Sequence, residues 1–384
     1  MTTKNYTIVS LYSSVFLVIG LLTAYFPLWL NQSLKLETQQ IGYILSLSGI
    51  LKAFFTMTIT VFIKNGNNLK AYLFGTAVFS MGLFLAIFSL KGFLSFNLIF
   101  FMVILFLISF SPVLPFVETI YSSLVKKPLK KYGKIRISGS IAFCVAVFFF
   151  GYFINKFSIE IFPLILVICL LSIGISALTA PNKIKVQKYN TLKSYKALFK
   201  KENKGLITFI IACSMLQASH AMYYGYSTII WESKGLSFFK IGVLWAFAIA
   251  AEVILFLKID KYFKSSLLFK TLLFCACVCF IRWTFTYFFE NFFILLIVQT
   301  LHGVTFALTH YSMIFLINKN IEATSKLLVQ SIYYILNGGI FITIFTVCCG
   351  YLISYTQGDE GYLLMSLLAF LSFILLYFKG NNLR

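Results

Sequence analysis

Long apolar runs alternate with short polar gaps along the whole of this 384-residue chain. An α-helix needs about 20 predominantly apolar residues to cross the hydrocarbon core of a bilayer. The gaps are short, so neighbouring membrane helices should run antiparallel. The pattern predicts twelve transmembrane helices, near residues 8–30, 40–63, 70–90, 95–121, 136–155, 160–180, 206–231, 239–259, 266–287, 292–317, 327–354 and 361–378.

The composition agrees with burial in lipid. Hydrophobic residues make up 60% of the chain and charged residues 11%, whereas soluble domains carry about 25% charged residues. The formal net charge of +21 is unevenly distributed, because with a cytoplasmic N-terminus 25 Lys and Arg residues fall in gaps on the cytoplasmic side and 5 on the other. This positive-inside pattern predicts that both termini are cytoplasmic, and it argues against nucleic acid as a partner.

The longest polar stretch divides the predicted helices into six and six. It predicts an N-terminal bundle over 1–180, a cytoplasmic linker over 181–205 and a C-terminal bundle over 206–384. The two halves share a short pattern, since Ile41-Gly42 follows Trp29 and Ile241-Gly242 follows Trp231, 200 residues later. Parallel repeats of this kind are typical of two-bundle transporters. The predicted fold class is therefore an all-α polytopic membrane protein of two six-helix bundles.

Several ionisable side chains fall within the predicted spans, where an exposed charge would cost from about 3 to more than 10 kcal/mol. Lys52 and Glu252 each lie ten residues after the glycine of the shared pattern, so they occupy matching positions in the two halves. They would either neutralise each other or compete for a charged substrate, and a static pair that only fixes packing is the alternative. The remaining ionisable residues of this kind are Glu118, His220, Arg282, His302 and His310, with Arg136 at the start of the fifth span.

Polar residues also recur at helical spacing. The seventh span carries Gln217, His220, Tyr224 and Ser227 on one face, the tenth carries His302, Thr305 and Thr309, and the eleventh carries Gln330, Tyr333, Tyr334 and Asn337. Such stripes often only bond neighbouring helices. Together with the buried charges they favour a substrate-lined aqueous cavity.

Other classes of function have weaker support. An intramembrane enzyme needs a nucleophile or a metal cluster, and no such spacing occurs among the eight cysteines or elsewhere. We therefore predict no enzyme activity, no metal and no cofactor. A sensor that no longer transports would be expected to carry a further soluble domain, for which the loops are too short.

The chain resembles the major facilitator superfamily, and within it the oligosaccharide and phenylpropionate proton symporters. The resemblance covers nearly the whole sequence, and the block at 217–226 is its most specific part. The residues that carry it are 26–30 leading to Ile41-Gly42, 132–140, 217–226, 251–254, Arg282-Trp283 and Leu301-His302.

The resemblance implies roles for single residues. Glu118 and Arg136 are similar in spacing to the sugar-binding pair of lactose permease, and Glu252, Arg282 and His302 fall where that permease carries its second charged cluster. One departure is Thr305, which stands where lactose permease has its proton-carrying carboxylate. The resemblance then implies another proton carrier, with Glu252 the first choice, and Glu118 and His302 further candidates.

Lys52, Arg136 and Arg282 together would suit a carboxylate substrate. The resemblance implies proton-coupled uptake of a small organic, possibly aromatic, acid by a monomer in the bacterial inner membrane. A sugar or nucleoside symporter and a drug efflux carrier are the alternatives. The expected substrate-binding residues are Lys52, Glu118, Arg136, His220, Tyr224, Arg282, His302 and Asn337.

Overall fold

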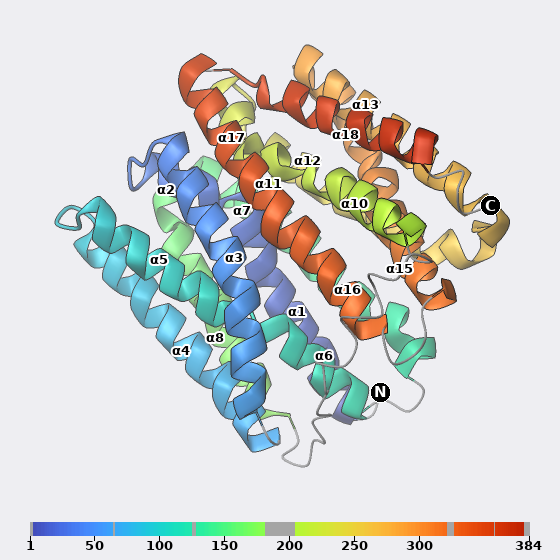
Figure 1. The fold of residues 1–384 in the computed structure, drawn as a ribbon. Coiled ribbons are helices and arrows are strands. Elements are labelled where there is room, and N and C mark those ends of the chain that lie inside the picture. The colour runs from blue at the N-terminus through green and yellow to red at the C-terminus, as the bar shows by residue number, and fades with distance from the viewer. Residues whose placement is uncertain are drawn as a thin grey trace. The chain divides into compact units, whose positions relative to one another are not determined.

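Helices account for every predicted membrane span. The computed structural model describes residues 3–63, 66–124, 128–180, 204–320, 326–356 and 358–379, and these ranges contain helices and no strand (Figure 1). Within these described ranges, eleven segments are long and apolar enough to cross a membrane. The remaining predicted span coincides with α3 (Thr38–Phe62), whose 25 residues would extend about 37 Å. Most of the predicted linker, residues 181–203, lies outside the described residues.

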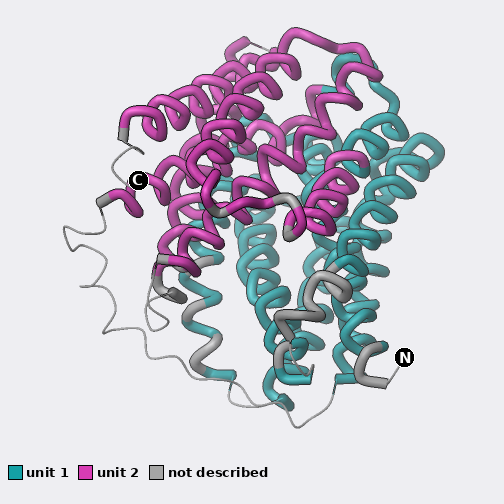
Figure 2. Tube along the Cα trace, turned by 90° about the vertical axis from the view of Figure 1, so that its right-hand side faces the viewer, with its two compact units in different colours: residues 1–187, 231–246 teal, residues 188–230, 247–384 magenta. Residues whose placement is uncertain are grey.

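The chain groups into two compact units (Figure 2). The first comprises Met1–Gln187 and Trp231–Ala246, and the second comprises Lys188–Ile230 and Phe247–Arg384. The boundary falls within a helix, because α12 (Phe238–Tyr262) contributes its first residues to the first unit and the rest to the second.

The first unit is built from helices with short connections. Besides α3, these are α1 (Thr3–Ala24), α2 (Phe26–Gln32), α4 (Gly66–Leu90), α5 (Phe96–Phe110), α6 (Val113–Leu124), α7 (Pro128–Phe157), the short η1 (Ile159–Ile161) and α8 (Phe162–Leu178).

The second unit contains more irregular helices. They are α10 (Lys204–Ala218), most of α11 (Ala221–Ser233) and α12, η3 (Ser265–Leu267), α13 (Leu268–Phe288), α14 (Phe292–Thr300), η4 (Gly303–Leu308), α15 (Thr309–Asn320), α16 (Lys326–Tyr334), η5 (Ile335–Phe341), α17 (Ile342–Thr356) and α18 (Gly361–Lys379). Both η4 and η5 are π-helical turns.

Aromatic packing fixes the core of the first unit. Trp29 stacks on Phe162 with ring centroids 5.4 Å apart and also contacts Phe84 at 5.7 Å. Close backbone approach adds to this core, because a Cβ on Gly242 would lie 2.5 Å from the carbonyl oxygen of Val147. The α12 segment of this unit therefore packs directly on α7, and Cys144 Sγ reaches the Ala246 carbonyl there at 3.6 Å.

The turns after the two repeated tryptophans each contain a residue with positive φ. Lys35 and Gly235, also 200 residues apart, both have positive φ, at 56° and 82°. The Leu236 amide donates to the Trp231 carbonyl at 3.0 Å, and the Leu34 amide donates to the Trp29 carbonyl at 3.4 Å. The left-handed conformation of Gly235, just before Leu236, ends α11. In the first turn Lys35 lies one residue beyond the corresponding bond.

Candidate functional site

Predicted spans one, four, seven and ten each contain an interruption of the regular helix, as does the eleventh at η5. The first breaks between α1 and α2, the fourth between α5 and α6 just before Pro112, and the seventh between α10 and α11 at Ser219-His220. The tenth passes through the π-helix η4. In transporters built from repeats, discontinuous helices in corresponding positions mark the binding region. The interruptions therefore identify the spans on which functional side chains are expected.

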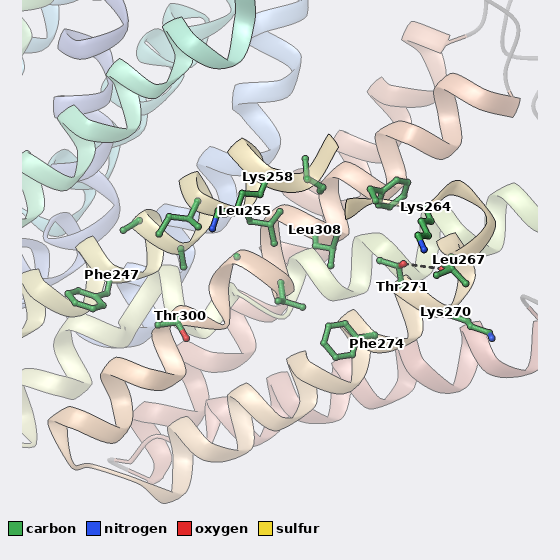
Figure 3. Close-up of a pocket in the computed structure, with 17 residues that line it drawn as sticks. Phe247, Leu255, Lys258, Lys264, Leu267, Lys270, Thr271, Phe274, Thr300 and Leu308 are labelled. Atoms are coloured by element: carbon green, nitrogen blue, oxygen red, sulfur yellow. Dashed lines mark hydrogen bonds between the residues drawn. The ribbon is translucent and has the colours of Figure 1, made fainter. Parts of the chain in front are cut away.

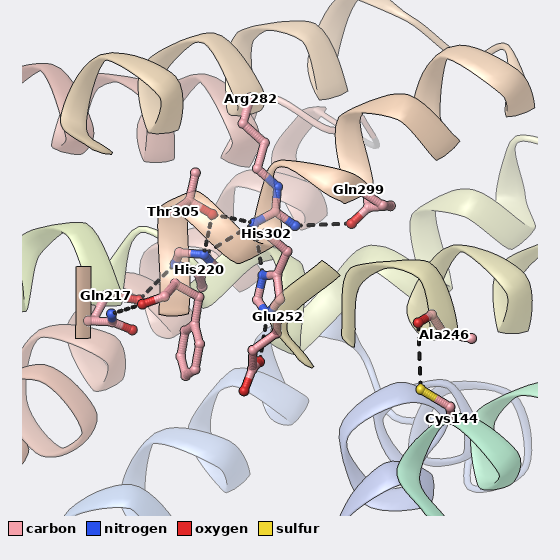
Figure 4. Close-up of polar contacts among 10 residues, drawn as sticks. Cys144, Gln217, His220, Ala246, Glu252, Arg282, Gln299, His302 and Thr305 are labelled. Carbon is pink, nitrogen blue, oxygen red and sulfur yellow. Dashed lines mark hydrogen bonds and ion pairs between the residues drawn. The ribbon is translucent and has the colours of Figure 1, made fainter. Parts of the chain in front are cut away.

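Arg282 lies at the centre of a polar cluster within the second unit (Figure 4). It projects from α13, and its side chain is completely buried. Its Nη1 donates to the Thr305 hydroxyl at 2.8 Å and contacts Nδ1 of His302 at 3.0 Å, while Nη2 donates to the side-chain oxygen of Gln299 at 3.0 Å. The interrupted seventh span supplies His220, whose Nε2 lies 3.2 Å from Nη1.

Hydrogen-bond roles fix the tautomers of the two histidines. A guanidinium only donates, so Nδ1 of His302 must accept and its proton resides on Nε2. Nδ1 of His220 lies 3.2 and 3.1 Å from the carbonyls of Leu216 and Gln217, so that nitrogen carries the proton. Its Nε2 can then accept from the Thr305 hydroxyl at 3.2 Å. Both rings are neutral in this arrangement.

Glu252 closes the network at its more exposed end. Its Oε2 lies 3.7 Å from Nε2 of His302, beyond direct hydrogen-bond length, and its side chain is 19% exposed against 1% for His302. The His302 ring therefore stands between the carboxylate of Glu252 and the guanidinium of Arg282. A proton arriving at Glu252 would change the charge of the cluster without entering its buried centre.

The hydrogen-bond partners of the Arg282 guanidinium are neutral groups. No described carboxylate lies within ion-pair distance of it, and its Nε has no acceptor among the described residues. Its guanidinium carbon lies 4.3 Å from the ring centroid of Trp283 and 5.0 Å from that of Tyr223. Aromatic faces attract a cation, but they do not replace a counter-ion in a buried site. The buried guanidinium of Arg282 therefore has no directly bonded anion among the described residues, and an added anion there would be attracted to it.

The π-helix η4 shapes one wall of the cluster. Thr305 and Phe306 belong to this turn, and the Phe306 carbonyl accepts from Nε2 of Gln217 at 2.9 Å. A π-helical turn leaves backbone groups without their usual partners and is frequent at functional sites. Gln217 supplies one of those partners, so it ties the seventh span to the tenth.

The other residues expected from the sequence lie elsewhere. Lys52 on α3 and Glu118 on α6 are half-buried in the first unit. Arg136 lies in α7, and its side chain is outside the described residues. Tyr224 is stacked on His220 with centroids 5.8 Å apart, whereas Asn337 lies in the π-helix η5.

Ser227, a member of an expected stripe, and His310, one of the expected ionisable residues, have partners outside the cluster. Ser227 is 2.6 Å from the hydroxyl of Tyr362 on α18, and His310 stacks on Tyr333 at 6.0 Å. Conversely, Gln299 and Tyr223 belong to the cluster, although the polar stripes expected from the sequence include neither. Gln299 lies three residues before His302, so helical spacing from a known polar residue could have indicated it.

Comparison with known proteins identifies the family. Residues 6–375, nearly the whole chain, match the family described as MFS_1 like. The chain belongs to the MFS_1 like family. The expected resemblance to the major facilitator superfamily is thereby confirmed, and this MFS_1 like protein is a multi-pass membrane transporter.

Individual relatives of this MFS_1 like chain are also transporters. A "probable 3-phenylpropionic acid transporter" of Escherichia coli (strain K12) is 28% identical over 270 residues, which cover 68% of each chain. An "uncharacterized transporter", YwbF, of Bacillus subtilis (strain 168) is 23% identical and matches over 68% of this chain and 66% of its own length. The crystal structure of a mutant of the nucleoside transporter NupG has the same fold, with a TM-score of 0.83, 15% identity, and coverage of 98% of this chain and 99% of the other.

Proposed function

We propose that this transporter takes up a small organic carboxylate together with a proton, by alternating access of the halves 1–180 and 206–384. The observation that supports this most is the charge environment of Arg282, a fully buried guanidinium with no carboxylate partner among the described residues. A guanidinium binds a carboxylate through two parallel hydrogen bonds. A substrate carboxylate would replace some of the neutral acceptors that Arg282 now has.

The cluster also offers a physical reason for coupling. Glu252 is the nearest acid in the network, held to Arg282 through the neutral ring of His302. While Glu252 is ionised, it offsets the positive charge of Arg282. When Glu252 takes up a proton, the cluster gains one positive charge and attracts an anion more strongly. Proton and carboxylate then favour each other's binding, and this reciprocity is what a symporter requires.

Aromatic side chains around the cluster suggest that the substrate carries an aromatic ring in addition to its carboxylate. Tyr223, Tyr224 and Phe306 surround the two histidines, with His302 and Phe306 stacked at 5.1 Å. Such rings pack well against another ring. The relative named as a probable 3-phenylpropionic acid transporter supports the same class. We therefore take 3-phenylpropionate, a carboxylate with one aromatic ring, as the first substrate to test.

Residues of the first half complete the proposal. Lys52 and Arg136 would add cationic groups for the substrate, and Glu118 is the second candidate for the proton. Asn337 would contribute a neutral hydrogen bond. The positive-inside pattern supports cytoplasmic termini in a bacterial inner membrane, and we expect a functional monomer.

Uptake into proteoliposomes tests the function directly. Purified protein is reconstituted, a proton gradient directed inward is imposed, and accumulation of labelled 3-phenylpropionate is followed with and without a protonophore. The proposal predicts accumulation that the protonophore abolishes. Accumulation of a panel of aromatic and short-chain acids that ignores the gradient would rule out symport. Preferential uptake of a neutral sugar or nucleoside, undiminished by Lys52→Gln, would rule out a carboxylate substrate.

A further inference from the structure

A groove on the second unit is separate from the cluster at Arg282 (Figure 3). It has a volume of about 820 Å³ and is formed by α12, α13 and η4 with the turn between α12 and α13. Its walls are almost entirely apolar and include Phe247, Ile254, Phe274, Val304 and Leu308. Polar groups do not converge inside it as they do in a substrate site.

The apolar walls face outward from the unit. Phe274 and Ile254 are 55% and 54% exposed, and Phe247 is 44% exposed. In a membrane-spanning bundle, exposed aromatic and branched side chains face lipid tails. Along α12 the wall from Phe247 to Lys258 covers eleven residues, or about 16 Å. That length is close to one half of the ~30 Å hydrocarbon core, and so matches the depth of a single leaflet.

Positive charge occupies one end of the groove. Lys258, Lys264 and Lys270 line it, and the last two lie at the end opposite Phe247 (Figure 3). Lys258 comes from α12, Lys264 from the turn after it and Lys270 from the first turn of α13. No described carboxylate lies within ion-pair distance of any of the three.

We propose that this groove binds one anionic glycerophospholipid, with its acyl chains along the apolar walls and its phosphate at the end that Lys264 and Lys270 line, while Lys258 adds positive charge along the wall. Lysines at the cytoplasmic end of membrane helices are common, because the positive-inside rule places them there whether or not they bind a lipid. Here they end a groove of one leaflet's depth, which supplies an apolar surface for the chains of the same molecule. Basic residues near a membrane surface each contribute about fivefold, or about 1 kcal/mol, to attraction of anionic lipid.

Lipid binding to the detergent-purified full chain tests the proposal. Native mass spectrometry would compare palmitoyl-oleoyl-phosphatidylglycerol with the phosphatidylcholine of identical acyl chains. We expect phosphatidylglycerol to bind roughly tenfold to hundredfold more tightly. The variant Lys258→Gln/Lys264→Gln/Lys270→Gln should lose that preference. Equal affinity for the two lipids in the unchanged protein, or a preference that survives the triple substitution, would overturn the proposal.

Matched controls separate this groove from general charge. Lys70→Gln/Lys261→Gln/Lys319→Gln removes the same charge from the same predicted side of the membrane outside the groove. This variant should keep the preference for phosphatidylglycerol. If it loses the preference to the same extent as the first triple variant, the groove is not the site.

A second pair of variants tests the apolar walls. Ala250→Trp fills the groove, whereas Ala71→Trp places the same ring on an exposed position of α4. The first should weaken binding of phosphatidylglycerol at least tenfold and the second should not. Glycerol phosphate, which carries the head-group charge without acyl chains, should fail to displace the lipid. Equal binding by the two tryptophan variants, or displacement by glycerol phosphate, would refute a lipid site.

Discussion

The substitution Glu252→Gln removes the proposed proton-binding carboxylate and leaves the proposed substrate-binding residue Arg282 in place. Glu252 Oε2 lies 3.7 Å from His302, and His302 lies 3.0 Å from Arg282 on its other side. Across the imidazole ring, the carboxylate and the guanidinium are then about 9 Å apart at most, and at an effective dielectric constant of about 20 their attraction is about 2 kcal/mol. A substrate carboxylate bound at Arg282 would lie at a similar distance from ionised Glu252, whose repulsion of about 2 kcal/mol corresponds to a factor of about 30 in affinity.

The assay is equilibrium binding of 3-phenylpropionate at about pH 7, where the free acid is ionised. Glutamine mimics the protonated side chain of glutamate, so the variant should bind about 30-fold more tightly than the unchanged protein. In proteoliposomes it should exchange internal for external substrate but not accumulate it against a gradient.

A control variant fixes the interpretation. Glu290→Gln makes the same chemical change at an exposed position after α13 and should keep the affinity of the unchanged protein. If Glu252→Gln bound the substrate no more tightly than the unchanged protein, Glu252 would not be the coupling carboxylate, and Glu118 would become the residue to test. If the variant lost binding while remaining folded, the electrostatic argument itself would be wrong.

Three further substitutions test the site and the packing. Arg282→Lys keeps the charge but loses the planar set of donors, so uptake should fall about 100-fold; transport within threefold of the unchanged protein would contradict the role of Arg282. Thr305→Asp places a carboxylate where the hydroxyl is 2.8 Å from Arg282, and should abolish carboxylate binding while Thr305→Ser preserves it; binding by the aspartate variant would show that Arg282 does not meet the substrate. Gly242→Ala would put a Cβ 2.5 Å from the Val147 carbonyl oxygen and should lower the melting temperature. Gly75→Ala meets nothing within 4 Å and should stabilise its helix by about 0.5–1 kcal/mol. Equal melting temperatures of the two variants would contradict the close approach at Gly242.

Membrane burial makes much of this fold readable from sequence. Each predicted span has its helix because lipid requires long apolar runs with internally satisfied backbones. Ionisable residues were equally visible, since an isolated charge in such a run is expensive. Arg282, His302 and Glu252 could therefore be singled out, and they do lie together in the second unit.

Helical spacing fails where the helices are irregular. The stripe from Gln217 to Ser227 is expected only for one continuous helix. The helix is interrupted at Ser219-His220, and Ser227 contacts Tyr362 on α18. The same assumption gave no sign of the π-helix η4, which brings Thr305 onto Arg282. Periodicity describes residues along one axis, whereas breaks and π-turns depend on the partners that neighbouring helices supply, such as Gln217 for the Phe306 carbonyl.

The approach of α12 to η4 makes the membrane itself an effector. A Cβ on Gly303 would lie 2.9 Å from the Ala251 carbonyl, so the two backbones are in contact. Ala251 and Gly303 line the groove, while their chain neighbours Glu252 and His302 hold the network around Arg282. One layer of backbone thus has the proposed lipid groove on one side and the charged network on the other. Changes in bilayer thickness or lipid composition should therefore alter how fast this carrier turns over, in addition to whether it is stable.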